Sequence, residues 1–362
     1  MASWLNPDED ILFFLEREMA GVFAISERRL FDGIVRFQGK LLIDPGKAVA
    51  ELTERLAPHG FYPLLRSEED LTILRVKPAA RPFRAGPWVN IVLLLATLAT
   101  TVFVGAVNRG ANPFANPWSL AQGLPFAITL LSILGVHELG HYFTARRYGI
   151  TVTLPYFIPA PIGLGTFGAF IKMKSPVADR RALFDVGIAG PLAGLCVALP
   201  AIVVGLRWSE LIATGSAEHV GVALGTPLMF SLLQWLTLGP IPQGGDVLLH
   251  PVAFAGWIGL FVTALNLLPI GQLDGGHIAY ALVGRHHRKV AIFALLVLIG
   301  MGIGYWPGWL FWASLSLILG LKHPPPLDDV TRLDRRRRLV GVASLLLLLS
   351  VITPSPFSFS ES

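Results

Sequence analysis

The chain has 362 residues, of which 53% are hydrophobic and 15% are charged, and its mean hydropathy is +0.60. This composition excludes a chain that is soluble over its whole length and indicates a membrane protein with several spans. The single cysteine, Cys196, excludes a framework of intrachain disulfides. The net charge of +5 could suggest an acidic partner, but the placement of the basic residues indicates membrane topology instead.

Residues 1–80 are predicted to form a small soluble α+β domain. Residues 35–43 alternate enough for a strand. Asp44 is a predicted N-cap, with a proline at the first helical position, for a helix over residues 46–57. Residues 61–76 then have the pattern of a hairpin. This domain carries no evident catalytic cluster in its sequence, so we expect a regulatory or docking role for it.

From Trp88 onward, seven apolar segments are predicted to enter the membrane. The sixth and seventh are short for a full span, so we expect six or seven spans in a polytopic α-helical protein. We assign residues 88–285 to the membrane core and residues 286–362 to additional C-terminal spans and a basic loop. The seven segments are 88–107, 120–145, 184–206, 252–271, 289–306, 309–321 and 339–353.

Lysine and arginine fall mainly on one side of this arrangement. On the other side, only Arg109 and Arg207 lie close to spans. The positive-inside rule therefore predicts a cytoplasmic N-terminal domain and a C-terminal tail on the outer side. The first ten residues show neither a signal nor a transit peptide, which fits a prokaryotic inner membrane and leaves an organelle open. The basic segments are 75–84, 146–147, 172–181, 285–289 and 322–338.

The second span carries His137, Glu138 and His141 within an otherwise apolar run. Ionisable groups are costly at membrane depth, so they mark a functional site. Residues four apart share a helix face, which allows both histidines to bind one cation. Glu138 lies about 100° round the helix and can reach a water on that cation. This H-E-x-x-H pattern predicts one Zn²⁺ per chain, with the glutamate as general base.

A catalytic zinc usually has three protein ligands and one open position. Asp274 lies in the segment 266–277, where Pro269 and several glycines break the helix. Irregular backbone at membrane depth is tolerated where it is buried or lines a wet cavity. Topology places Asp274 and the histidines at the inner ends of their spans, so Asp274 is predicted as the third ligand. His277 is left out because a fourth protein ligand would close the site.

The motif 137–141 together with the segment 266–276 resembles the site-2 protease family of intramembrane zinc metalloproteases. The resemblance covers roughly residues 88–285. Many bacterial members carry a second proline where this chain has Gly271, and many carry a PDZ domain, which is not evident here. Both differences make the chain more similar to the PDZ-free branch that includes plastid members of photosynthetic organisms.

This resemblance implies roles for further residues. Asn266 would hydrogen-bond the substrate backbone or the tetrahedral oxyanion. Residues 161–171 are apolar, glycine-rich and too irregular for a helix, and they resemble the family's re-entrant β segment. Such a segment could pair with an unwound substrate strand, the alternative being an ordinary interfacial loop. The residues expected to contact that strand are Gly165, Thr166, Phe167 and Gly168.

The predicted function is that of an intramembrane zinc metalloprotease. It would hydrolyse peptide bonds in or near transmembrane segments of membrane proteins, close to the cytoplasmic face, in regulated intramembrane proteolysis. The expected partners are such substrates and the lipid bilayer. No nucleic-acid partner is predicted, because Arg335 to Arg338 fit anchoring against anionic headgroups. Neither the substrate nor the oligomeric state is predicted.

Two alternatives are weighed against this function. A metal or ion transporter would need acidic or histidine sites along several spans, whereas these groups gather at one depth. A catalytically silent binding protein on the same scaffold would be expected to lose the glutamate or a ligand. This chain retains all four candidates: His137, Glu138, His141 and Asp274.

Overall fold

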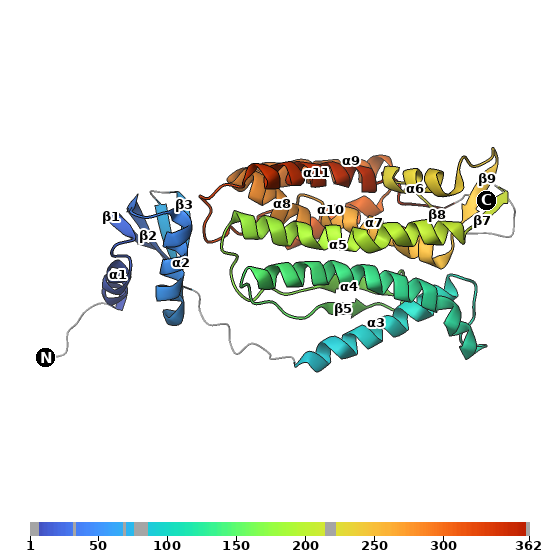
Figure 1. Cartoon of the computed structure of the whole chain (residues 1–362), viewed down its shortest axis with the longest axis horizontal. Helices are drawn as coiled ribbons and strands as arrows, with labels where there is room; N and C mark the ends of the chain where they lie inside the picture. The colour runs from blue at the N-terminus through green and yellow to red at the C-terminus, as the bar shows by residue number, and fades with distance from the viewer. Residues whose placement is uncertain (1–6, 32–33, 68–69, 76–85, 214–221, 360–362) are drawn as a thin grey trace. The chain divides into compact units, whose positions relative to one another are not determined.

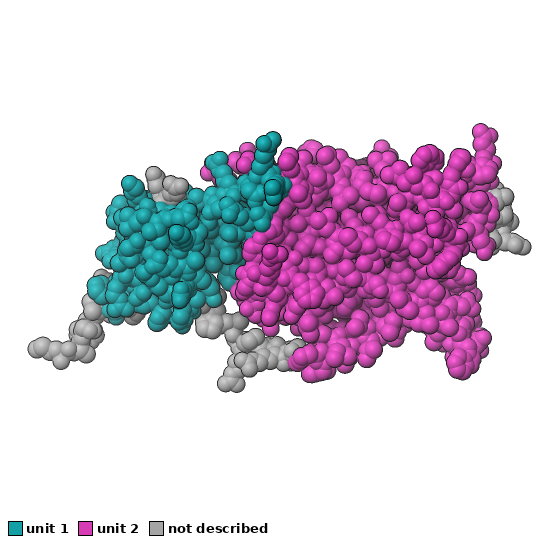
Figure 2. Space-filling model, viewed as in Figure 1, with its two compact units in different colours: residues 1–84, 176–183, 324–337 teal, residues 85–175, 184–323, 338–362 magenta. Residues whose placement is uncertain are grey.

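The computed structural model describes residues 7–31, 34–67, 70–75, 86–213 and 222–359. The chain divides into two compact units, shown in different colours in Figure 2. Unit 1 contains residues 1–84, 176–183 and 324–337, and unit 2 contains residues 85–175, 184–323 and 338–362. Two segments that are remote in sequence from the N-terminus therefore belong to unit 1.

Unit 1 is built on a four-stranded antiparallel sheet in the order β1-β2-β4-β3. The strand predicted at 35–43 corresponds to β2, and the predicted hairpin to β3 and β4, whose connecting residues 68–69 lie outside the described residues. The elements α1 and β1 come in addition. The bounds are α1 Pro7–Glu18, β1 Phe23–Phe31, β2 Ile34–Leu41, α2 Pro45–Leu56, η1 Ala57–His59, β3 Phe61–Ser67 and β4 Asp70–Arg75 (Figure 1).

The start of α2 follows from its sequence. The side chain of Asp44 accepts hydrogen bonds from the backbone N–H groups of Gly46 and Lys47, at 3.1 and 3.3 Å, which confirms the predicted N-cap. The apolar face of α2 is buried in one cluster with α1 and β3. Unit 1 therefore has a hydrophobic core of its own, which includes Leu15, Leu52, Leu56 and Leu65.

The remaining elements belong wholly or mainly to unit 2. Of these, α5 and α11 each begin in unit 1 and continue in unit 2. In chain order they are α3 Pro87–Val107, η2 Pro117–Gly123, α4 Leu124–Arg147, β5 Tyr156–Pro159, β6 Thr166–Phe170, α5 Arg180–Arg207, β7 Glu210–Ala213, β8 Val222–Leu224, α6 Leu228–Leu238, β9 Gly245–Leu248, α7 Pro251–Asn266, α8 Asp274–Val283, η3 Gly284–His286, α9 His287–Gly304, α10 Gly308–Leu319, α11 Arg335–Val351 and β10 Phe357–Phe359.

Several helices of unit 2 have the length and hydropathy of membrane-spanning segments. Within the described residues, four helical stretches are long and apolar enough to cross a bilayer: 87–107, 117–147, 180–207 and 274–304. The helices α6, α7 and α10 are apolar but shorter. The chain is thus mostly helical, with helices long and apolar enough to cross a membrane, while the count of six or seven spans stays a prediction. Of the basic segments used to orient it, residues 76–84 lie outside the described residues.

Helix α7 lies in the core of unit 2. Its residues are buried on nearly every face, as expected for a helix that is apolar all round. Gly259 allows close approach, because a Cβ there would lie 3.0 Å from the side chain of Ile133 on α4 and 3.1 Å from that of Ala198 on α5. The helix ends at Asn266, five residues before the end of the predicted segment 252–271. This packing brings the end of α7 beside α4 and α5.

Candidate metal and catalytic centre

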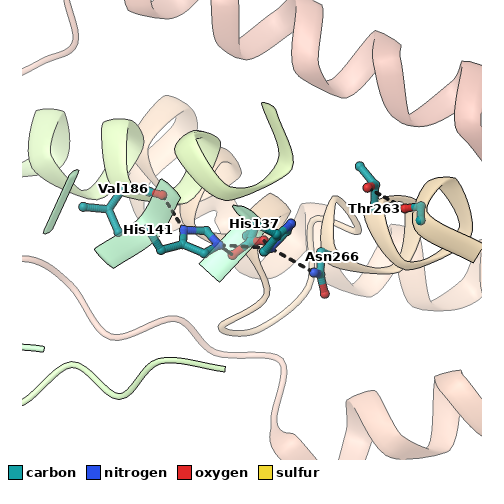
Figure 3. Close-up of polar contacts among 7 residues, drawn as sticks. His137, His141, Val186, Thr263 and Asn266 are labelled. Atoms are coloured by element: carbon teal, nitrogen blue, oxygen red, sulfur yellow. Dashed lines mark hydrogen bonds and ion pairs between the residues drawn. The ribbon is translucent and has the colours of Figure 1, made fainter. Parts of the chain in front are cut away.

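The two histidines of the H-E-x-x-H motif and Asp274 meet in unit 2. His137 and His141 are 5% and 6% exposed on α4, and Asp274 is the first residue of α8. The two Nε2 atoms lie 3.1 Å apart. Each Nε2 also lies 3.2 Å from an oxygen of Asp274, Oδ2 for His137 and Oδ1 for His141. Three possible metal ligands therefore lie together, and Figure 3 shows the two histidines beside each other.

This triangle fits a zinc ion. Zinc bonds to nitrogen and oxygen are about 2.0–2.2 Å long, so ligand atoms in a tetrahedral site lie about 3.3 Å apart. The observed separations of 3.1–3.2 Å, which involve both carboxylate oxygens of Asp274, are close to that spacing. The space beside the triangle also depends on Gly190, where a Cβ would lie only 2.0 Å from Nε2 of His141. In the part of the chain that the structure describes, this is the group of three ligand residues that could hold a metal.

A backbone carbonyl orients one of the ligands. Nδ1 of His141 lies 2.7 Å from the carbonyl oxygen of Val186 on α5, in a buried contact (Figure 3). With Nδ1–H donating to this oxygen, Nε2 is left with its lone pair directed at Asp274 and His137. The sequence contains no signal for this partner, because every residue carries a carbonyl group.

The small residues of α5 let it approach the metal ligands closely. A Cβ at Gly140 on α4 would lie 2.6 Å from the carbonyl oxygen of Ala189, and one at Gly194 would lie 3.2 Å from Nδ1 of His137. Residues 190–194 carry a small-xxx-small pattern, which is typical of close helix packing. The packing partner is the H-E-x-x-H helix itself.

The segment between α7 and α8 explains the glycine that departs from the family pattern. Gly271 has a φ of +53°, whereas a proline ring holds φ near −65°. A Cβ at this position would also lie 2.4 Å from the carbonyl oxygen of Gly320. Glycine is therefore required at 271 in this fold.

Two further predicted residues lie near the triangle in different ways. The amide Nδ2 of Asn266, at the end of α7, lies 3.2 Å from Nε2 of His137 (Figure 3). His277 lies outside the ligand group, with its Nδ1 2.5 Å from Nε2 of His323. Asn266 thus lies beside a ligand of the candidate site, and His277 pairs with a neighbour instead.

The glycine-rich segment 161–171 supplies the second strand of a short hairpin, and the first strand lies just before it. Strands β5 and β6 pair antiparallel, with Tyr156 opposite Phe170 and Pro159 opposite Thr166. Phe167 is 74% exposed. Within the described residues, β6 pairs with β5 alone, which leaves its other edge without a strand.

The hairpin is held to two helices. The hydroxyl of Thr100 on α3 donates to the carbonyl oxygen of Gly165 at 2.7 Å. The backbone of Ile171, the residue after β6, lies close to the carboxylate of Glu138 on α4. Glu138 is 6% exposed. No local sequence pattern marks the contacts of Thr100 and Ile171, because these contacts depend on how the hairpin folds back.

Comparison with known proteins agrees with this geometry. The model of peptidase family M50 matches residues 125–304. The chain is 28% identical over 354 residues to the probable zinc metalloprotease EGY2, chloroplastic, of Arabidopsis thaliana, covering 93% of this chain and 63% of that relative. It is 36% identical over 234 residues to the probable zinc metalloprotease EGY1, chloroplastic, of the same plant, covering 63% and 42%.

A third relative is the probable zinc metalloprotease EGY3, chloroplastic, of Oryza sativa subsp. indica, which is 29% identical over 374 residues and covers 92% of this chain and 62% of that relative. The chain thus spans less than two thirds of the length of these relatives. No solved structure matches it significantly. Residues 125–304 therefore belong to peptidase family M50, the site-2 protease family, and the chain as a whole resembles the plastid-type members.

Proposed function

We propose that this protein is a zinc-dependent endopeptidase that cleaves membrane proteins in or near their transmembrane segments. The observation that carries the proposal is the triangle of His137, His141 and Asp274, next to the buried carboxylate of Glu138. The relatives are named as probable zinc metalloproteases, which supports one Zn²⁺ per chain at these three residues.

The chemistry assigns distinct tasks to the residues. When bound at this triangle, zinc would supply Lewis acidity and an acidic water. The carboxylate of Glu138 takes the proton from the attacking water and passes it to the departing peptide nitrogen. The Ile171 backbone lies beside this carboxylate. The amide of Asn266, which lies 3.2 Å from Nε2 of His137, is proposed to donate a hydrogen bond to the developing oxyanion.

The hairpin is proposed to hold the substrate. A peptide bond inside a helix has its carbonyl and amide engaged, so the substrate must be locally extended before attack. The edge of β6 that carries no strand among the described residues can pair with such a segment. The proposed contacts are with Gly165, Thr166, Phe167 and Gly168, close in sequence to Ile171 and hence to Glu138.

We propose that cleavage takes place near the face of the membrane where the basic loops lie, with the N-terminal domain on that same side. This would be the cytoplasmic face of a prokaryotic inner membrane, and the N-terminal domain would select or restrain substrates in regulated intramembrane proteolysis. The chloroplastic relatives make a plastid membrane the alternative location.

The test compares membrane proteomes of cells that carry the wild type or Glu138→Gln. We expect a short set of intact single-span proteins to accumulate in the variant while their soluble fragments disappear. Glu54→Gln, an exposed position on α2, serves as the matched control and should resemble the wild type. Full activity of Glu138→Gln, with equal expression and bound zinc, would refute the assigned mechanism.

Transport remains the competing function for intramembrane histidines and carboxylates. A path across the bilayer would need further ligand groups at other depths. Within the described ranges, no second group of three or more His, Cys, Asp or Glu residues is placed to hold a metal. Zinc flux into proteoliposomes would nevertheless favour transport over proteolysis, and we expect none above that of empty liposomes.

A further inference from the structure

The sheet of unit 1 continues into two segments from elsewhere in the chain. The backbone of Leu65 on β3 donates to the carbonyl oxygen of Leu327 at 2.8 Å and accepts from the N–H of Asp329 at 3.0 Å. Residues 327 and 328 in turn donate to the carbonyl oxygens of Val177 and Ala178, at 3.0 and 2.8 Å. Both pairings are parallel. We call the segments 177–179 and 327–329 the loop ladder.

Side chains lock the loop ladder in place. Nε of Arg180 lies 2.8 Å from Oδ1 of Asp329, and these side chains are only 17% and 12% exposed. Asp328 is 1% exposed and accepts hydrogen bonds from the N–H groups of Val330 and Thr331. Leu327 belongs to the hydrophobic core of unit 1. Because these groups are largely buried and hydrogen-bonded, the loop ladder stabilises unit 1 more than a contact between exposed loops would.

The loop ladder leads directly into the helix that orients a metal ligand. Oδ1 of Asp179 accepts from the N–H of Ala182 at 2.7 Å and so caps the first turn of α5. Val186, whose carbonyl oxygen holds His141, is seven residues further along the same helix, about 10 Å at 1.5 Å per residue. Gly190 lies one turn beyond Val186 and faces Nε2 of His141.

We infer that Asp179, Arg180 and Asp329 are positioning residues for the metal centre, acting through α5 on His141. The loop ladder fixes the start of α5 to the sheet of unit 1. Because α5 is a continuous helix, a shift at its start changes where the Val186 carbonyl and Gly190 stand beside His141. Unit 1 is thereby a part of the protein that sets the geometry of the metal site. This inference rests on the proposed function, since it assumes that His141 binds zinc.

The test uses the full-length protein in lipid nanodiscs, with three readouts. Hydrogen exchange of peptides that cover residues 61–67 and 324–331 reports the loop ladder. Zinc affinity is measured by competition with a chromophoric chelator, and the visible spectrum of the Co²⁺-substituted protein reports ligand geometry. None of these readouts requires proteolysis, so an inactive protein can still be measured.

The key variants are Asp329→Asn, which removes the ion pair, and Asp329→Pro, which also removes the N–H that donates to Leu65. We expect faster exchange in the loop ladder, zinc affinity lower by about 10-fold or more, and altered Co²⁺ bands. The double variant Arg180→Asp with Asp329→Arg restores the ion pair in reverse and should recover all three. Arg55→Gln is the matched control, because Arg55 donates to the carbonyl oxygen of Glu18 inside unit 1 and should leave the zinc affinity unchanged.

Three results would overturn the inference. The first is faster exchange in the loop ladder with zinc affinity and Co²⁺ bands unchanged. The second is an equal loss of zinc affinity in Arg55→Gln, which would indicate general destabilisation of unit 1. The third is unchanged exchange in both Asp329 variants. A wild type that binds no zinc would refute the proposed function and this inference together, whereas zinc binding without peptidase activity would refute the proposed function alone.

Discussion

Nε2 of His137 and Oδ2 of Asp274 lie 3.2 Å apart, although 137 residues separate them in the chain. One belongs to the middle of a long helix and the other begins a helix after an irregular segment. A carboxylate that is only 14% exposed between two imidazoles needs either protons or a cation to offset its charge. The arrangement therefore leads to experiments on the metal and on the packing around it.

Loss of Asp274 should remove the metal. In Asp274→Ala the triangle loses the oxygens that face both histidines, so we expect zinc affinity to fall by more than about 100-fold, because changes to outer-shell partners alone cost 10–100-fold. Zinc content after gel filtration, measured by atomic emission, checks this. Asp246→Ala, at an exposed position on β9, is the control and should retain one zinc per chain. Normal zinc content in Asp274→Ala would show that the ligand assignment is wrong.

A methyl group at position 190 should disturb the metal site. In Gly190→Ala the added Cβ would lie 2.0 Å from Nε2 of His141, so either the metal or α5 must move. We expect zinc binding to fall by at least 10-fold and cleavage to be lost. Gly300→Ala makes the same change on α9, where nothing lies within 4 Å, and should have no effect on zinc binding. Equal zinc affinity in the two variants would contradict the close packing of α5.

The hydroxyl that holds the hairpin should affect substrate binding. Thr100→Val removes the donor to the Gly165 carbonyl, whose 2.7 Å distance is shorter than the 3.1 Å distances to two carbonyls of its own helix. One hydrogen bond contributes about 1 kcal/mol, so we expect KM for a cleavable peptide to rise about fivefold, with kcat less affected. Ser314→Ala removes a hydroxyl that bonds only within α10 and serves as the control. A change confined to kcat would speak against a role of the hairpin in substrate binding.

Restoring the family's proline at 271 should destabilise this protein. A proline ring cannot adopt the φ of +53° found at this position. In Gly271→Ala, the positive φ already costs about 1–3 kcal/mol of backbone strain, and the added Cβ meets the carbonyl oxygen of Gly320. We expect Tm to fall in the order wild type, Gly271→Ala, Gly271→Pro. Gly239→Ala shares a positive φ but has nothing within 4 Å, so it isolates the strain from the contact. A Gly271→Pro protein as stable as the wild type would show that the segment adopts another conformation.

Much of the centre follows from local sequence patterns. The spacing of His137 and His141 places both on one helix face, whatever the rest of the fold. Asp274 is identified because a catalytic zinc needs a third ligand and helix breakers surround this aspartate. Gly190 and Gly194 are recognisable as packing residues, but only the fold shows that they pack on the metal ligands.

Other features depend on contacts that leave no local pattern. The carbonyl of Val186 and the backbone of Ile171 are groups that every residue has, so only tertiary structure selects them. The loop ladder consists of two three-residue segments, which are too short to show a strand period. Helix α7 ends at Asn266 rather than near 271, and the residues between α7 and α8 are arranged by their packing on Gly320 as much as by their own preferences.

The loop ladder also bears on how the protein is made. A ribosome delivers residue 65 long before residue 329, and at about 5–20 residues per second the intervening 264 residues (329 − 65) take roughly 13 to 53 s. During that interval the edge of β3 that later pairs with residues 327–329 has no partner from the loop ladder. The helices from α3 to α10 must enter the bilayer in the same interval. The sheet of unit 1 is therefore completed only after most of the membrane part has been inserted. A chain whose insertion stalls keeps an open strand edge, which is the kind of surface that chaperones and quality-control proteases bind.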